Sequence, residues 1–281
     1  MDPVLYAEVA RLFSMAMKGR YPDARIIACG SGSLGKSGVH LDSLVIARIA
    51  RHVDYISPHH YQQLSLYGED GVAQYGAYLD RLAGWIAASA NPDMRIFVSE
   101  WNLTGTDMRT GLFTGGFLGR LERTPAVEMA AAALFLRHTS ATGWDNAFIN
   151  FDQAGWFPAP NYVVFRLWRE HYLPRRIRLE GEGTGLDLTA TSSEDGHITC
   201  LKIVNAGEQE VRLCVQQALL LGTPSWEVIQ ADSLTERNTM EEPGRIRPER
   251  REAGREGNDV VLTVPPLSAS VLEMRNEELC D

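Results

Sequence analysis

The chain has 281 residues, 44% hydrophobic and 22% charged, a balance typical of a globular protein with room for a large buried core. Its formal net charge of −9 argues against nucleic acid and anionic membranes as partners and is compatible with neutral polymers such as glycans. No apolar run approaches the roughly 20 residues that a membrane-spanning helix needs, so no membrane association is expected. The acidic start "MDPVLYAEVA" does not resemble a secretory signal, which favours the cytoplasm unless the chain belongs to a longer parent.

The first 175 residues alternate between amphipathic segments and short apolar runs. A helix is predicted to begin at Asp2-Pro3 and to end at Gly19, with one apolar face. The residues of that face, which recur at helical spacing, are Leu5, Val9, Leu12, Phe13 and Ala16. Further helices are predicted over 41–50, 72–90, 126–140 and 161–172. The continuous apolar runs between them predict strands 25–29, 53–57, 95–99 and 146–151.

Two polar stretches of this region are predicted to be loops. One is the aromatic segment 59–71, and the other is the Gly- and Thr-rich segment between 103 and 125. Helices alternating with fully apolar strands predict a parallel sheet with crossover helices.

The pattern changes after 172–176. Short segments with alternating polarity are separated by turn residues, which is typical of a β-sandwich. These predicted strands are 186–193, 197–205, 211–217, 225–231, 259–264 and 268–274. The charge-dense segment 237–257 between them is predicted to be a long surface loop. We therefore expect one domain over 1–175 and a second over 176–281.

The four cysteines, Cys29, Cys200, Cys214 and Cys280, lie far apart in the sequence and show no metal-ligand spacing. They are expected to be isolated thiols in a reducing compartment. A Cys200–Cys214 bridge between neighbouring strands remains the alternative. No metal site is predicted.

Polar and aromatic residues gather just after the predicted strands, in the segments 59–63, 100–102 and 150–156. In parallel α/β folds, and in (β/α)8 barrels above all, sites form at the carboxyl ends of strands. These three segments are therefore the candidate site.

Several stretches in order resemble one known family. They are "YAEVARLFSMAMKGRYPDARIIACGS", "VDYISPHHY", "IFVSEWN", "VEMAAAALFLRHTS", "LTERNTMEEPGRIRPE" and "VVLTVPPLSASVLEM". They resemble the C-terminal half of the α-L-arabinofuranosidases of glycoside hydrolase family 51, which are retaining (β/α)8-barrel enzymes with a C-terminal β-sandwich. The resemblance implies an α/β plus all-β fold. About the last four strands of a partial (β/α)8 TIM barrel would occupy 1–175, and a C-terminal antiparallel β-sandwich 176–281.

By this resemblance Glu100, in the "EWN" motif, is the catalytic nucleophile at the end of the seventh barrel strand. His59 and Tyr61 match the His-x-Tyr that follows the sixth strand, with the tyrosine beside the nucleophile. A carboxylate nucleophile must stay ionised and needs hydrogen-bond donors, which Tyr61 and either Asn102 or Trp101 could supply. His59 fits a sugar contact as well as a scaffold role.

Trp144 and Trp156, near the strand predicted over 146–151, are placed to stack on a sugar face, although packing explains them equally well.

A retaining glycosidase also needs an acid/base carboxyl group. In the family it is the glutamate of an Asn-Glu pair after the fourth strand, and the only such pair here lies in the C-terminal "NEELCD" (276–281). Glu69, Asp70, Asp145 and Asp152 are alternatives, each of which reads better as a solvated loop carboxylate. We expect the acid/base to lie outside this chain.

Half a barrel would leave strands 25–29 and 146–151 with open edges, which invite pairing with another chain. A homo-oligomer or pairing with a separate N-terminal half is therefore expected. A truncated or split gene, a wrongly assigned start codon and a self-associating half-barrel all fit this pattern.

The resemblance implies removal of arabinofuranosyl residues from plant polysaccharides or oligosaccharides by double displacement, without a metal or organic cofactor. The arabinose-containing glycan as partner depends on the C-terminal "NTMEEP", "RPE" and "VPPLS" pattern, because xylosidase-like relatives share strand-end glutamates. The alternatives are a non-catalytic carbohydrate-binding or assembly protein and an inactive remnant.

Overall fold

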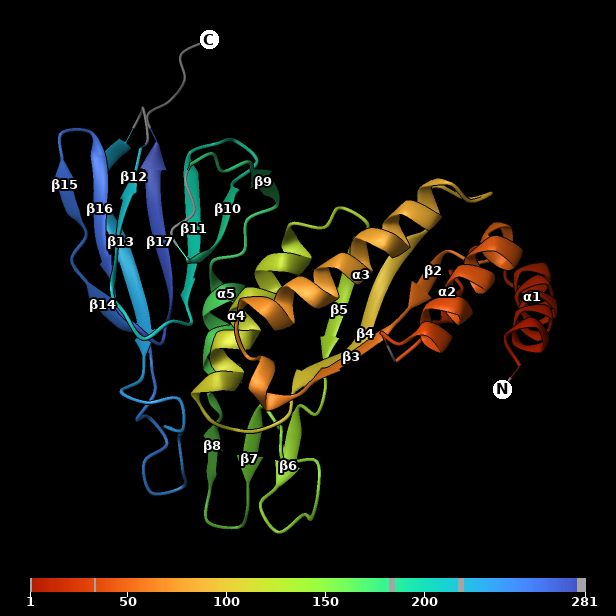
Figure 1. The fold of residues 1–281 in the computed structure, drawn as a ribbon, viewed down its shortest axis with the longest axis horizontal. Helices are drawn as coiled ribbons and strands as arrows, with labels where there is room; N and C mark the ends of the chain where they lie inside the picture. Colours follow the sequence, from red (N-terminus) through yellow and green to blue (C-terminus); the bar gives the residue numbers. More distant parts are fainter. Residues whose placement is uncertain (1, 33, 182–184, 217–219, 277–281) are drawn as a thin grey trace. The chain divides into compact units, whose positions relative to one another are not determined.

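The computed structural model describes residues 2–32, 34–181, 185–216 and 220–276 (Figure 1). The chain forms two compact units. One comprises Met1–Gln62, Ala73–Asn102 and Thr124–Ala133, and we call it the parallel-sheet unit. The other comprises Gln63–Val72, Leu103–Arg123 and Leu134–Asp281, and we call it the antiparallel-sheet unit. At this coarse level the predicted combination of an α/β part with a β-rich part is confirmed. Within the described ranges, no helix is long and apolar enough to cross a lipid bilayer.

The parallel-sheet unit is built on five short strands. They are β1 (Ile27–Cys29), β2 (Tyr55–Ser57), β3 (His59–Gln62), β4 (Arg95–Leu103) and β5 (Val127–Ala132). The pairs β1–β2, β2–β4 and β4–β5 are parallel, and the order is β1-β2-β4-β3 with β5 also on β4. Parallel strands need crossover connections. The segments that connect these strands contain α2 (Lys36–Ile49), η1 (Ala50–His52), η2 (Leu64–Leu66), α3 (Glu69–Ala87) and α4 (Met108–Glu122), of which η2 and α4 belong to the antiparallel-sheet unit.

The first helix, α1 (Pro3–Arg20), begins where its sequence predicts. Asp2 is the N-cap, and its Oδ1 accepts the backbone N–H of Val4 at 2.7 Å. Its apolar face is open to solvent, with Leu12 57% and Phe13 64% exposed.

Two adjacent predictions are wrong. The segment between 103 and 125 contains helix α4, and the segment 126–140, predicted to be a helix, forms strands β5 and β6 (Leu136–His138). The alanines of 126–140 have high helix propensity, but pairing with β4 overrides it. The fourth strand of the parallel sheet is therefore β5 and not the predicted 146–151. Residues Ile149–Phe151 instead form β7 of a separate sheet, ordered β6-β7-β8 (β8, Trp156–Pro158).

Two further segments differ from their predicted conformation. Residues 59–62, predicted to be loop, form β3, and β4 continues through Leu103 instead of ending at Ser99. Glu100 to Asn102 therefore lie within a strand and not after it.

The antiparallel-sheet unit contains α4 and α5 (Pro160–Glu170), the three-stranded sheet β6-β7-β8 and two larger sheets. The six-stranded sheet has the order β14-β13-β17-β11-β10-β9, and the second has the order β12-β16-β15. Their strands are β9 (Arg175–Ile177), β10 (Asp187–Ser192), β11 (Ile198–Asn205), β12 (Val211–Val215), β13 (Leu220–Gln230), β14 (Glu249–Arg251), β15 (Gly254–Glu256), β16 (Asp259–Val264) and β17 (Ser268–Asn276). All six strands predicted after residue 176 are present.

The six-stranded sheet has an apolar core on each of its two faces. On β11, Leu201 and Ile203 join a core shared with β12 and β16, whereas Cys200 and Val204 join a core shared with α4 and α5. Because strand side chains alternate between faces, the central strands need apolar residues on both sides.

The segment 237–257 is more than a surface loop, since it contains β14 and β15 and an anchored turn. Asn238 is buried, donates to the carbonyls of Pro158 and Ile246 at 3.0 and 3.1 Å, and accepts from the Ile246 N–H at 2.6 Å.

Cys29, Cys200 and Cys214 are free thiols. The alternative Cys200–Cys214 bridge is not formed, because Cys200 belongs to the face of its sheet that packs against α4 and α5, opposite the core shared with β12. Cys280 lies outside the described residues.

Candidate active site

Glu100 lies at an irregularity of β4. From Val98 to Trp101 β4 advances three residues while its partner β5 advances two, from Ala130 to Ala132, so β4 carries one extra residue here. Such β-bulges re-aim side chains and are frequent beside active sites. The Glu100 side chain is 44% exposed, although it belongs to a central strand.

Two side chains of β3 meet the Glu100 carboxylate. The Tyr61 hydroxyl donates to its Oε2 at 2.9 Å, and the His59 Nδ1 lies 3.5 Å from the same oxygen. Burial and the Glu100 charge raise the pKa of Tyr61 to about 12, so the phenol remains a hydrogen-bond donor at neutral pH. The structure thus brings His59, Tyr61 and Glu100 together.

The residue between them, His60, points to the other face of the strand. It is buried and stacks on Tyr75 of α3 with ring centroids 3.9 Å apart. Burial lowers the pKa of His60 to about 4, so the ring is neutral under physiological conditions. The period-2 pattern of "HHY" could have indicated this division of roles.

The buried carboxylate of Asp42 holds the segment after β1, which in turn is hydrogen-bonded to the first residue of β3. Asp42 of α2 accepts the backbone N–H of Ser31 and the hydroxyl of Tyr78, both at 2.7 Å, and the Ser31 carbonyl accepts the His59 N–H at 3.0 Å. Burial raises the pKa of Asp42. Gly30 permits this approach, because a Cβ there would lie 3.1 Å from the Pro58 nitrogen and 3.2 Å from Asp42 Oδ1. Sequence reasoning missed Asp42, since an aspartate within an amphipathic helix gives no local signal.

Trp101 and Asn102 are fully buried. Both are therefore shielded from solvent within the sheet, in contrast to Glu100 beside them.

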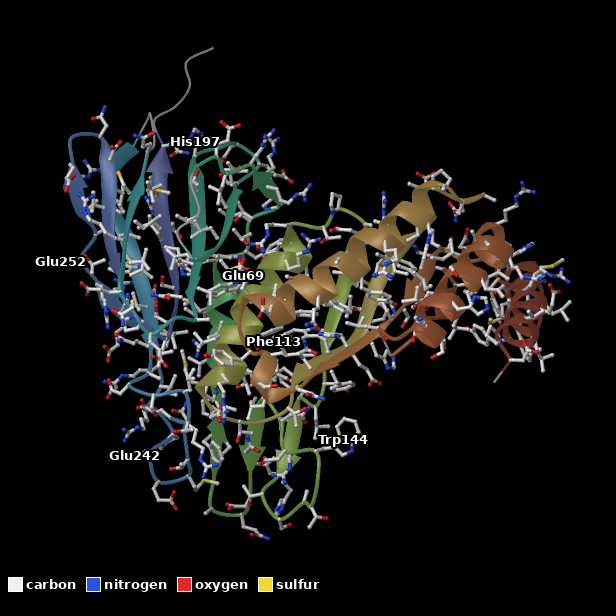
Figure 2. All side chains as sticks on the ribbon, in the orientation of Figure 1. Glu69, Phe113, Trp144, His197, Glu242 and Glu252 are labelled. Carbon is white, nitrogen blue, oxygen red and sulfur yellow. The ribbon has the colours of Figure 1, made fainter. Side chains whose placement is uncertain are left out.

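Trp144 and Trp156 belong to the antiparallel-sheet unit. Trp144 lies between β6 and β7, is 64% exposed and has a φ of 49°, a left-handed conformation that is uncommon for a bulky residue (Figure 2). Trp156, in β8, is 58% exposed.

The four alternative acid/base carboxylates also belong to the antiparallel-sheet unit. Glu69 and Asp70 form the first turn of α3 instead of a loop, and Glu69 is labelled in Figure 2. Asp145 lies 3.5 Å from Arg137, and Asp152 accepts the Ala154 N–H at 2.7 Å.

Comparison with known proteins identifies the class to which this fold belongs. The chain is similar to the family 51 α-L-arabinofuranosidase of Thermotoga petrophila RKU-1, with a TM-score of 0.83 and 20% identity, covering 97% of this chain and 62% of that one. It is also similar to the α-L-arabinofuranosidase of Thermotoga maritima, solved with arabinose, with a TM-score of 0.82 and 20% identity, covering 98% of this chain and 62% of that one. For the family 51 α-L-arabinofuranosidase of Bifidobacterium longum the TM-score is 0.78 and the identity 18%, covering 98% of this chain and 64% of that one.

The family assignment comes from sequence. The model of the α-L-arabinofuranosidase C-terminal domain matches residues 99–268, more than half of the chain. The chain therefore belongs to this family, and the resemblance predicted from its motifs is confirmed. It spans less than two thirds of the length of the solved relatives, and no curated protein sequence matches it.

Proposed function

We propose that this chain provides the nucleophile side of a retaining α-L-arabinofuranosidase. In this proposal residues 1–175 are the second half of a (β/α)8 barrel and residues 176–281 are its C-terminal β-sandwich. The observation that carries it is the 2.9 Å hydrogen bond from Tyr61 to Glu100 at the β4 bulge, in a chain of this family.

Glu100 attacks the anomeric carbon in the first step, and the bond from that carbon to the leaving oxygen breaks. The Tyr61 hydroxyl stabilises the ionised carboxylate, because a hydrogen bond to the charged form favours it. Water then hydrolyses the glycosyl-enzyme and releases Glu100. His59 is proposed as a sugar contact beside the nucleophile, and Trp144 and Trp156 as sugar-stacking surfaces.

The acid/base glutamate is proposed to come from the part of the family's barrel that this chain does not span. In a retaining enzyme its carboxyl group lies about 5–5.5 Å from the nucleophile. The leaving oxygen would receive its proton from that group.

The surface that would receive this missing half is proposed to be α1 together with the edge strand β1. The apolar side chains of α1 that are at least 40% exposed include Leu5, Val9, Leu12, Phe13 and Met17. In β1, Ile27 is 45% exposed, and within the described part of the chain this strand pairs on one side only, with β2. An apolar helix face beside an unpaired parallel strand suits a partner that adds further β/α units.

The substrate is proposed to be an arabinofuranosyl group on a glycan. The family to which the chain belongs and the fold it shares with these enzymes support this class, and the residues do not distinguish one linkage from another.

The decisive experiment uses 2,4-dinitrophenyl α-L-arabinofuranoside, whose leaving group departs without protonation. We expect the purified chain to release dinitrophenol in a burst and to gain the mass of one pentosyl group on the peptide containing Glu100. Glu100→Gln should abolish both signals, whereas Glu252→Gln, which removes an exposed carboxylate from the other unit, should leave them unchanged.

Absence of an adduct with the wild-type chain would contradict the proposal and would favour a non-catalytic carbohydrate-binding role or an inactive remnant. An adduct that persists in Glu100→Gln would move the nucleophile to another residue. Substrates with poor leaving groups should be cleaved only when the missing half is added.

A further inference from the structure

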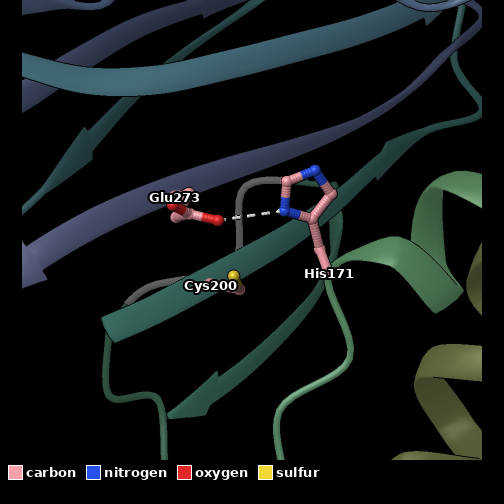
Figure 3. Close-up of side chains that lie close together, drawn as sticks. All are labelled: His171, Cys200 and Glu273. Atoms are coloured by element: carbon pink, nitrogen blue, oxygen red, sulfur yellow. Dashed lines mark hydrogen bonds and ion pairs between the residues drawn. The ribbon is translucent and has the colours of Figure 1, made fainter. Parts of the chain in front are cut away.

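A second cluster of reactive side chains lies in the antiparallel-sheet unit (Figure 3). Cys200 of β11 and Glu273 of β17 are directly opposite each other in an antiparallel pair, so both side chains emerge on one face. Cys200 belongs to the core shared with α4 and α5, which identifies this face. His171, the C-cap residue of α5, extends onto the same face from the end of the helix.

Glu227 completes the surroundings of the imidazole. It faces Val271 across β13 and β17, two residues from Glu273, and therefore projects from the same side of the sheet. His171 Nδ1 lies 3.2 Å from Glu273 Oε2, and His171 Nε2 lies 3.7 Å from Glu227 Oε1. One ring thus has a carboxylate at each nitrogen.

The three ligand atoms of His171, Cys200 and Glu273 lie within 4.8 Å of one another. Ligands on one tetrahedral zinc ion lie roughly 3.3–3.6 Å apart, given metal–ligand distances of about 2.0–2.3 Å. The nitrogen–oxygen separation of 3.2 Å is already close to this range, so the sulfur would have to approach these two atoms by at most about 1.5 Å.

The charge around the cluster favours a cation. Glu227 and Glu273 both face the ring, while Lys202, two residues along β11 from Cys200, is engaged by Glu122 at 2.5 Å. Two carboxylates beside one imidazole make this position attractive to a cation.

We propose that His171 Nδ1, Cys200 Sγ and Glu273 Oε form a binding site for a zinc-like divalent cation, with the Glu227 carboxylate facing the other ring nitrogen. A mixed nitrogen, sulfur and oxygen ligand set is that of zinc and its neighbours in the first transition series. A carboxylate on the far nitrogen of a metal-bound histidine fixes the tautomer and the ring orientation. Since the His171 side chain is 16% exposed and that of Glu273 28%, water can reach the fourth position.

Binding requires loss of the Cys200 proton to solvent. Metal affinity should therefore rise with pH. The site would tie the end of α5 to β11 and β17, and metal would raise the melting temperature of the chain.

Cobalt titration of the full chain tests the site, because a cobalt–thiolate bond gives a near-ultraviolet charge-transfer band. We expect a band that saturates at one equivalent, is accompanied by visible bands of tetrahedral cobalt and is displaced by zinc. The variant Cys29→Ser/Cys214→Ser/Cys280→Ser, which keeps only Cys200, should retain the band. Cys200→Ser should lose it.

Two less buried positions keep the test independent of core packing. His171→Asn should weaken cobalt binding at least tenfold, and Glu227→Gln should weaken it by about tenfold through the orientation of the ring. Circular dichroism verifies that each variant is folded. No charge-transfer band in the wild type, or a band that survives Cys200→Ser, would overturn the proposal.

Discussion

The two units of this chain differ in how completely they bury their apolar surface. The six-stranded sheet of the antiparallel-sheet unit has an apolar core on each face, and its central strands contribute alternately to both. The parallel-sheet unit leaves an apolar face of α1 and the edge strand β1 in contact with solvent. A sheet whose two faces are covered by elements of the same chain needs no further partner. A parallel sheet of few strands needs additional elements to cover its faces and edges.

The ionisable groups of the two proposed sites also differ in exposure. In the parallel-sheet unit Glu100 is 44% exposed and its tyrosine partner reaches it from the neighbouring strand. In the antiparallel-sheet unit Lys202 and Cys200 are each 1% exposed beneath α4 and α5. In the two proposals, the exposed Glu100 carboxylate reacts with an external molecule, and the buried cluster around Cys200 holds a small ion.

A matched pair of leucine substitutions tests the difference in burial between the two units. One of them, in the core, should cause the largest change in the free energy of unfolding among these predictions. Leu272, in the core between the two antiparallel sheets, is fully buried, whereas Leu12 of α1 is 57% exposed. Leu272→Ala should lower the free energy of unfolding by about 3–5 kcal/mol, because it leaves a cavity. Leu12→Ala should change it by less than about 0.5 kcal/mol. Urea denaturation followed by circular dichroism measures both, and equal losses would show that the α1 face is covered in solution.

The buried His60 should make the parallel-sheet unit sensitive to acid. Its folded-state pKa of about 4 lies below the usual 6.5, so protonation favours the unfolded state. This contribution to stability is fully present above pH 6.5 and is lost as the pH falls towards 4, on the order of 3 kcal/mol in total.

The control is His60→Phe, which keeps an aromatic ring on Tyr75 but cannot titrate. Urea midpoints between pH 4 and 7.5 should fall more steeply for the wild type than for this variant. Parallel profiles would show that His60 titrates normally.

The smallest expected effect concerns Tyr61. Tyr61→Phe removes the hydroxyl that donates to Glu100, and the rate of adduct formation with the dinitrophenyl substrate should fall about tenfold. Tyr55→Phe is the control, because its hydroxyl bonds to Glu128 at 2.8 Å elsewhere in the same unit. A rate unchanged by Tyr61→Phe, or lowered equally by both variants, would remove Tyr61 from the proposed mechanism.

Local sequence determined much of this protein. Asp2-Pro3 starts α1, apolar runs form β1, β2 and β4, and alternating segments form the strands after residue 186, because caps and side-chain periodicity act over a few residues. The ordered motifs also identified the family and brought His59, Tyr61 and Glu100 forward as one site, and the structure places these three in contact.

Tertiary structure decided the rest, as α4 illustrates. Its glycines suggest a loop, yet a Cβ at Gly115 would lie 2.8 Å from Val204, so the packed helix requires glycine there despite its low helix propensity. The alanine-rich segment after it becomes β5 because β4 offers a parallel strand with which to pair. His171, Cys200 and Glu273 have no common sequence pattern, since a helix end and two paired strands bring them together only in the folded chain. Interactions between residues so distant in sequence depend on the packing of whole elements, which local patterns do not encode.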